Sequence, residues 1–233
     1  MIRSIFFSLF FFVGIFIISI LFLPSLIMPN KITLFGGKLM GNWAKFCVEK
    51  ILLSKIIIKG KENIIKNKKF FIAASHQSVF ETFFLQTIFN SPIFILKKEL
   101  LFIPIFGWYL KKIGSVSINR NKTTKENIGF FENVTKVMKK TNRPLIIFPQ
   151  GTRVLPTERP PFKKGVARIY DELKVDCQPV AINSGYVWPK NGPRALNKEI
   201  VISILKPIET GLSKKDFIKT LEDVIYLELN LIN

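Results

Sequence analysis

The sequence is poor in the residues that build metal sites. Its 233 residues include one histidine, His76, and two cysteines, Cys47 and Cys177. The cysteines form no C-x-x-C pair and lie far apart, so neither a zinc-ligand spacing nor a disulfide framework is present. Two unpaired thiols are typical of a reducing compartment. We therefore expect no bound metal and a chain that faces the cytoplasm.

Acidic residues are also scarce, because 16 Asp and Glu stand against 35 Lys and Arg, a formal net charge of +19. This charge favours an anionic partner, either nucleic acid or lipid headgroups, although a compositional bias toward Lys produces it as well. No RNP-like, zinc-finger or helix-turn-helix pattern occurs, so we expect no nucleic-acid partner. The absence of a G-x-S-x-G motif and of a second histidine argues against a serine hydrolase built on Ser78.

Apolar residues are abundant: 48% of the chain is hydrophobic and 23 residues are Phe. Residues 4–23 carry no charge, and about 20 apolar residues let a helix cross ~30 Å of hydrocarbon. A cleaved signal peptide is the alternative, but bulky residues follow where a small-x-small site would be needed. We expect residues 1–55 to form membrane-anchoring helices at the inner (cytoplasmic) membrane, with the basic remainder facing the cytoplasm.

Two interpretations remain open for residues 34–51, where apolar side chains recur at helical spacing. This amphipathic helix either lies on the bilayer or packs on the core of the protein. Beyond it, short apolar runs alternate with helical patterns. Strands are predicted at 55–60, 70–75, 116–120, 144–150, 177–184 and 199–208, and helices at 78–90, 123–141, 165–173 and 213–232. The alternation predicts an α/β domain over residues 56–233, with a mostly parallel sheet flanked by helices.

The single histidine follows one of the predicted strands. His76 comes directly after the apolar run 70–74, and Glu81 lies five residues later, in the first turns of the next helix. This spacing lets the carboxylate approach one imidazole nitrogen and leaves the other nitrogen as a general base. The pair has no nucleophile of its own, so the proton would come from a substrate hydroxyl. A histidine with a purely structural role is the alternative.

A second polar turn ends the strand predicted at 144–150. Gln150, Gly151, Thr152 and Arg153 stand there in sequence. Glycine allows close backbone approach, exposed amides bind an oxyanion or phosphate, and Arg offers a planar fork for phosphate. The alternative is a tight turn with Arg153 in solvent.

Four segments, in order over residues 56–207, resemble the glycerolipid acyltransferase family. "SHQSVFET" is similar to its H-x-x-x-x-D block, "PIFGWYLKKIGSVSINR" to its second block, "FPQGTR" to its F-P-E-G-T-R block and "QPVAINSG" to its fourth block. The resemblance implies transfer of a fatty acyl group from an acyl thioester to the sn-2 hydroxyl of 1-acyl-sn-glycerol-3-phosphate (lysophosphatidic acid), which forms phosphatidic acid. The donor would be acyl-coenzyme A or acyl-acyl carrier protein, and no cofactor would be needed.

The resemblance also implies roles for single residues. His76 would take the hydroxyl proton and return it to the departing thiolate, and Glu81 would orient the imidazole. Arg120 and Arg153 would bind the phosphate of the acceptor. Four positions would shape or support this site: Gly151, Thr152, Gln150 and Pro179.

The chain departs from the family pattern at two positions. Glu81 stands where Asp is usual, which keeps the charge, so activity should survive. Gln150 stands where Glu is usual, which leaves a lysolipid with another headgroup open as acceptor. Lys97 and Lys98 are further candidates for contact with phosphate or with the thioester carrier, unless they are a surface pair. A membrane-tethered module that binds anionic lipid without catalysis is the remaining alternative, but it leaves the two polar turns unexplained.

Overall fold

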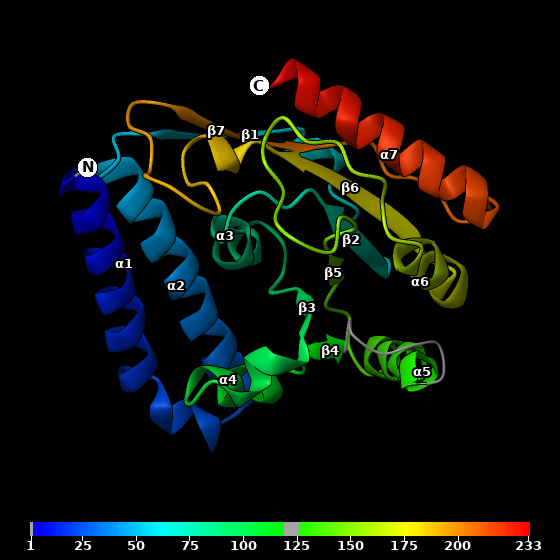
Figure 1. Cartoon of the computed structure of the whole chain (residues 1–233). Helices are drawn as coiled ribbons and strands as arrows, with labels where there is room; N and C mark the ends of the chain where they lie inside the picture. Colours follow the sequence, from blue (N-terminus) through cyan, green and yellow to red (C-terminus); the bar gives the residue numbers. More distant parts are fainter. Residues whose placement is uncertain (1, 119–125) are drawn as a thin grey trace.

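The computed structural model describes residues 2–118 and 126–233, and within them the chain forms one sheet of seven strands (Figure 1). The strand order is β1-β7-β6-β2-β5-β3-β4. The strands are β1 (Lys55–Lys59), β2 (Phe70–Ala74), β3 (Ile93–Lys97), β4 (Val116–Ile118), β5 (Leu145–Ile147), β6 (Asp176–Ile182) and β7 (Glu199–Ile204).

Neighbouring strands are parallel everywhere except at the β6–β7 pair. Strands β6, β2, β5, β3 and β4 therefore share one direction, and their carboxyl ends meet at one edge of the sheet, where α/β proteins bind ligands. The predicted α/β fold with a mostly parallel sheet is confirmed. Strand β3 was missed by the sequence prediction, because its apolar run follows the Phe-rich helix before it after only a short polar break.

Helices cover both faces of the sheet. The α-helices are α1 (Ile2–Leu21), α2 (Asn30–Lys50), α3 (Phe80–Ile88), α4 (Phe106–Lys112), α5 (Glu126–Lys139), α6 (Gly165–Leu173) and α7 (Lys214–Leu231), and short 3₁₀ turns lie at η1 (Leu23–Leu26), η2 (Lys61–Asn63), η3 (Lys98–Phe102) and η4 (Ser184–Tyr186). Helices α1, α2 and α3 belong to the core on one face, and α5, α6 and α7 to the core on the other.

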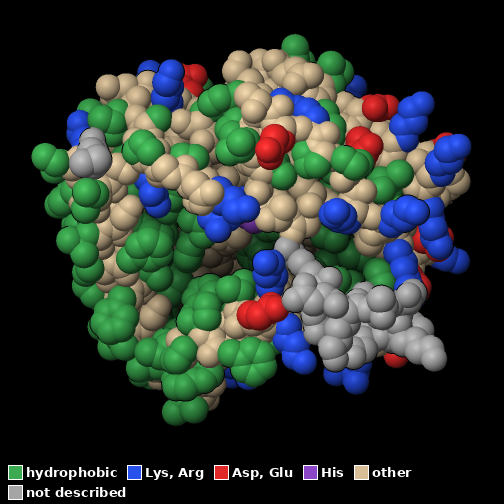
Figure 2. Space-filling view, viewed as in Figure 1, with side chains coloured by type: hydrophobic (Ala, Val, Ile, Leu, Met, Phe, Trp, Pro, Cys, Tyr) green, Lys and Arg blue, Asp and Glu red, His purple; other side chains and the backbone are tan. Residues whose placement is uncertain are grey.

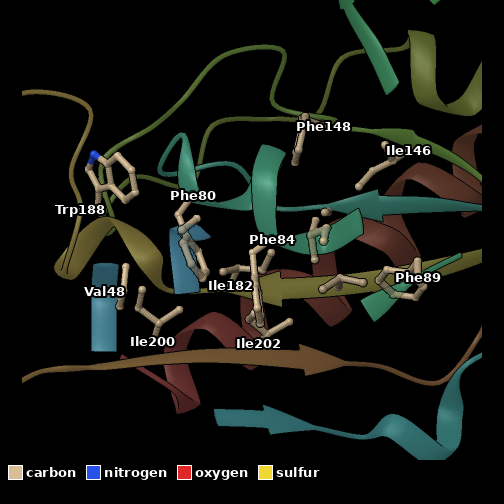
Figure 3. Packing of buried hydrophobic residues seen from close by; sticks show 14 of the residues in the cluster. Val48, Phe80, Phe84, Phe89, Ile146, Phe148, Ile182, Trp188, Ile200 and Ile202 are labelled. Atoms are coloured by element: carbon tan, nitrogen blue, oxygen red, sulfur yellow. The ribbon is translucent and has the colours of Figure 1, made fainter. Parts of the chain in front are cut away.

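Helix α2 packs on α3, so the core-packing interpretation of residues 34–51 describes the structure. Val48 of α2 lies in one buried cluster with Phe84 of α3 and Ile182 of β6 (Figure 3). The two helices approach so closely at Gly41 that a Cβ there would stand 2.5 Å from the Phe83 carbonyl oxygen. The outer face of α2 still exposes Phe35 and other apolar side chains.

Helix α1 runs alongside the α/β domain. Its Phe7 and Phe11 rings each stand edge-on to Trp188, at 4.8 Å between ring centroids. Near its start, Ser4 Oγ accepts a hydrogen bond from Arg194 N–H (2.9 Å), and near its end the Ser19 carbonyl accepts one from Tyr109 Oη (2.6 Å). Helix α1 is therefore attached to the domain at both ends, and the domain boundary at residues 55–56 stays a prediction.

Candidate functional site

His76 is held by contacts to the turn that follows β5. Its backbone N–H donates to Gln150 Oε1 (2.7 Å), and its carbonyl accepts from Val154 N–H (2.9 Å). The imidazole stacks on Phe148, with 4.1 Å between ring centroids and 18° between planes. The side chain keeps 14% of its surface exposed. The histidine is therefore fixed in orientation while one edge stays accessible to a substrate.

Glu81 lies buried beneath the imidazole at the start of α3. Its Oε1 accepts hydrogen bonds from Gln77 N–H (2.9 Å), from Ser78 N–H (3.0 Å) and from Ser184 Oγ (2.7 Å). Its Oε2 is 4.0 Å from His76 Nδ1. That separation is longer than a hydrogen bond, so in this geometry an ionised Glu81 would act on the imidazole through its charge.

The protonation of Glu81 reflects its burial. Removal from water raises the pKa of this carboxyl to about 7, while the hydrogen bonds from Ser184, Gln77 and Ser78 oppose the rise. A shift of this kind in a histidine–carboxylate pair at a strand end is typical of catalytic sites.

The second polar turn lies beside this pair. Gly151 has φ +75°, a left-handed conformation that glycine adopts without strain, and its N–H donates to the Phe148 carbonyl (2.9 Å). Thr152 is exposed. Arg153 is half-buried and has no hydrogen bond or ion pair within the described residues. Because the Gly151 N–H is used within the turn, the group that the turn offers to a phosphate or oxyanion is the Arg153 guanidinium.

Gln150 points inward rather than toward solvent. It is buried, its Oε1 binds the His76 N–H, and it lies against Tyr226 of α7, whose pKa burial raises to about 12. A glutamate at this position would present the same kind of oxygen to His76. The Gln therefore retains the contact that joins the two turns.

The structure brings some predicted residues together and leaves others apart. His76, Glu81, Gln150 and Gly151 share one end of β2 and β5. Pro179 lies mid-strand in β6, opposite Ala73 of β2. Lys97 and Lys98 are exposed at the end of β3, which is separated from β2 by β5. Arg120 lies outside the described residues. Within the described ranges no group of three or more His, Cys, Asp or Glu side chains is placed to hold a metal.

Sequence reasoning missed three contributors to the site. The Phe148 ring stacks against the imidazole, and the Ser184 hydroxyl donates a hydrogen bond to Glu81. Gln77 Oε1 accepts from Gly185 N–H (3.1 Å), which ties the β2 loop to the β6 loop. Ser184 could have been found, because it stands two residues beyond β6 at the edge where parallel strands end.

The site opens into a hollow. Figure 2 shows it near the centre of this face, with hydrophobic side chains on the side of the N-terminal helices and the histidine colour at its upper edge. The fold and the site thus define an α/β protein with a histidine–carboxylate pair beside a hollow at the carboxyl ends of its parallel strands, which is the kind of geometry that general-base catalysis requires.

Comparison with known proteins supplies the family. The profile described as Acyltransferase matches residues 55–183, more than half of the chain, and the chain belongs to this family. A Pseudomonas aeruginosa protein named 1-acyl-sn-glycerol-3-phosphate acyltransferase is 32% identical over 157 residues, which cover 65% of this chain and 59% of that protein. A Saccharomyces cerevisiae protein of the same name is 32% identical over 195 residues, with 79% and 63% covered. The chain thus matches about three fifths of the length of these relatives.

The fold also has a solved counterpart. The crystal structure of the 1-acyl-sn-glycerophosphate (LPA) acyltransferase PlsC from Thermotoga maritima superposes with a TM-score of 0.80, at 23% identity, and covers 100% of this chain and 98% of that one. The resemblance inferred from the four sequence blocks is confirmed at the level of family and fold.

Proposed function

We propose that this protein is a 1-acyl-sn-glycerol-3-phosphate O-acyltransferase, which transfers a fatty acyl group from an acyl thioester to the sn-2 hydroxyl and forms phosphatidic acid. The observation that carries the proposal is the 2.7 Å hydrogen bond from His76 N–H to Gln150 Oε1. This bond holds the candidate base beside the turn that ends in Arg153. The names of the similar proteins support lysophosphatidic acid as the acceptor.

The proposed chemistry needs a base and a charge partner. With Nδ1 toward Glu81, Nε2 of His76 would accept the hydroxyl proton as the acceptor oxygen attacks the thioester carbonyl. The tetrahedral oxyanion then collapses, the carbon–sulfur bond breaks, and the imidazolium returns its proton to the thiolate. Ionised Glu81 stabilises the imidazolium between these two steps. Because the thioester is already activated, the reaction calls for no metal and no cofactor.

Acceptor binding would rest on the turn after β5. Arg153, which has no ion pair within the described residues, would form charge-assisted hydrogen bonds with the phosphate, joined by Arg120 as the family resemblance implies. Gly151 and Thr152 would line the same pocket. Acyl-coenzyme A and acyl carrier protein are both anionic, and the +19 charge of the chain suits either donor.

We further propose that the N-terminal helices attach the enzyme to the cytoplasmic side of the inner membrane. Within the described residues α1 is the one helix long and apolar enough to cross a bilayer, with a mean hydropathy of 2.7 and 33% of its most apolar stretch buried. Since both ends of α1 contact the α/β domain, the helix would lie along the interface and present its exposed Phe16 face to lipid.

A transfer assay tests the proposal. The full-length protein, purified in detergent and returned to vesicles, is given a labelled acyl thioester with lysophosphatidic acid, two other lysophospholipids or monoacylglycerol. We expect phosphatidic acid as the main product, and product formation at least ~10²-fold slower with His76→Ala. Preference for another lysophospholipid would change the acceptor and keep the class, whereas no transfer to any acceptor would contradict the proposed function.

A membrane-fraction experiment tests the attachment. Hydrophobic insertion is not screened by salt as surface charge is, so the protein should stay with membranes through high-salt washing. Release by salt would show that the attachment is electrostatic instead.

A further inference from the structure

The segment 98–112 exposes large apolar side chains although it lies outside the N-terminal helices. It consists of η3, the turn 103–105 and α4, and it leaves 71% of Phe102, 44% of Ile103 and 50% of Trp108 accessible. Single exposed apolar residues are common, but a group that includes two aromatic rings on one short segment indicates an interaction surface.

The exposed side chains are presented by a strained turn. Ile105 has φ 63° and ψ −60°, and Phe106 N–H donates to the Pro104 carbonyl (2.6 Å). A β-branched residue seldom adopts a positive φ, so packing on both sides must hold the turn in place. On one side Gly107 allows close contact with η3, because a Cβ there would stand 2.2 Å from the Leu101 carbonyl oxygen. Strain of this kind accumulates at functional surfaces.

This segment adjoins the apolar surface of the N-terminal helices. Helix α4 packs against η1 and α2, and Tyr109 Oη donates to the Ser19 carbonyl of α1 (2.6 Å). The corner between η1 and α2 exposes 92% of Ile27. Figure 2 shows hydrophobic side chains along the side where α1 and α2 lie and again at the bottom, where Figure 1 places α4. The exposed apolar side chains of the 98–112 segment therefore adjoin those of α1, η1 and α2.

Basic residues flank the exposed rings. Lys97 and Lys98 precede them, Lys111 and Lys112 follow them, and Glu99 is the one carboxylate within residues 97–112. Aromatic rings at headgroup depth with lysines beside them are typical of a membrane interface, where the ammonium groups meet lipid phosphates. A protein partner would not require lysines on both sides of the exposed apolar side chains.

We propose that the 98–112 segment is a second membrane contact, which inserts Phe102, Ile103 and Trp108 into the headgroup region of an anionic bilayer. The proposal rests on the membrane attachment by α1 and α2 proposed above. The hollow at His76 (Figure 2) lies between the side where Figure 1 places α1 and α2 and the lower region where it places α4. Two contacts hold the tilt of the domain, so the hollow faces the bilayer surface and a lysolipid reaches it without leaving the membrane.

Site-specific labels test the second contact. Cys47 and Cys177 are buried, so a thiol-reactive polarity-sensitive dye labels an introduced surface cysteine selectively. Three variants of the full chain are compared in phosphatidylcholine vesicles with a minor fraction of phosphatidylglycerol: Phe102→Cys in the segment, Phe16→Cys on α1, and, as the control, Lys215→Cys at an exposed position of α7. Spin-labelled phospholipids serve as quenchers.

We expect the Phe102 and Phe16 labels to shift to the blue and to be quenched, while the Lys215 label stays in water. A Phe102 label in water beside an inserted Phe16 label would overturn the second contact alone. Both labels in water would overturn the membrane attachment as well. A blue shift at Phe102 without vesicles that grows with protein concentration would show that a second copy of the chain covers the segment, and would overturn the proposal.

A partition measurement gives an independent test. The double variant Phe102→Ser, Trp108→Ser should bind these vesicles at least about tenfold more weakly than the unchanged protein, because two large apolar side chains no longer leave water. The double variant Lys214→Ser, Lys215→Ser on α7 is the matched control and should bind as the unchanged protein does. Equal binding by both double variants would refute the inserted segment.

Discussion

Replacing Glu81 by Gln should stabilise the protein at neutral pH while it reduces activity. Burial raises the pKa of this carboxyl from 4.5 to about 7 in the folded state. The folded protein thus holds the proton more tightly than the unfolded chain, and stability falls as the pH rises from about 4.5 to about 7. A difference of about 2.5 pH units corresponds to a penalty of about 3 kcal/mol above pH 7, which an uncharged amide avoids.

Part of this gain is lost again in the variant. The amide oxygen can still accept from Gln77 N–H and Ser184 Oγ, but the amide NH₂ would face Ser78 N–H, which in the unchanged protein is shared between Oε1 (3.0 Å) and Oε2 (3.1 Å). One mismatched hydrogen bond costs about 1 kcal/mol. The net gain is about 2 kcal/mol, or roughly 4–8 °C in Tm for a chain of this size. Turnover should fall by at least ~10²-fold, because the imidazolium loses its counter-charge.

Thermal unfolding at about pH 8 and about pH 5, paired with the transfer assay, measures both effects. The stability gain should be present at the higher pH and largely lost at the lower one, since the carboxyl is then mostly protonated in the folded state. Glu62→Gln, at an exposed position on η2, is the control and should leave the pH dependence of Tm unchanged. A variant that is less stable at both pH values, or equally stabilised at both, would refute the reasoning.

Three further substitutions separate base, positioning residue and phosphate contact. His76→Ala should lose at least ~10²-fold in turnover with an unchanged Tm. Near-normal turnover would contradict general-base catalysis by His76. Ser184→Ala removes a hydrogen bond that lowers the pKa of Glu81, so the acid limb of the kcat/KM profile should move to higher pH, with partial recovery in Ser184→Thr. If the acid limb of the kcat/KM profile did not shift, the role of Ser184 would be purely structural. Arg153→Ala should cost on the order of 2 kcal/mol, about thirtyfold in kcat/KM, with lysophosphatidic acid but little with monoacylglycerol, and Arg153→Lys should recover only part. Equal slowing of both acceptors would show that Arg153 does not bind phosphate.

Local pattern was enough to predict much of this protein. The alternation of apolar runs and helical patterns predicted six of the seven strands of the described structure. The polar turns at His76 and at Gly151 were placed at strand ends because polar residues and glycine follow each apolar run directly. The uncharged run at 4–23 predicted α1 for the same reason. These features depend on residues close together in the chain, and short-range periodicity determines them.

Tertiary structure alone decided how those pieces act on one another. Ser184 lies 103 residues from the Glu81 oxygen that it bonds, and Gln150 lies 74 residues from the His76 N–H. The pKa of Glu81 depends on its burial beneath loops that follow separate strands. The antiparallel pairing of β6 with β7 depends on how the chain folds back between residues 182 and 199. No spacing rule reaches across such distances, because these contacts form only when the packed cores on both faces of the sheet bring the strand ends together.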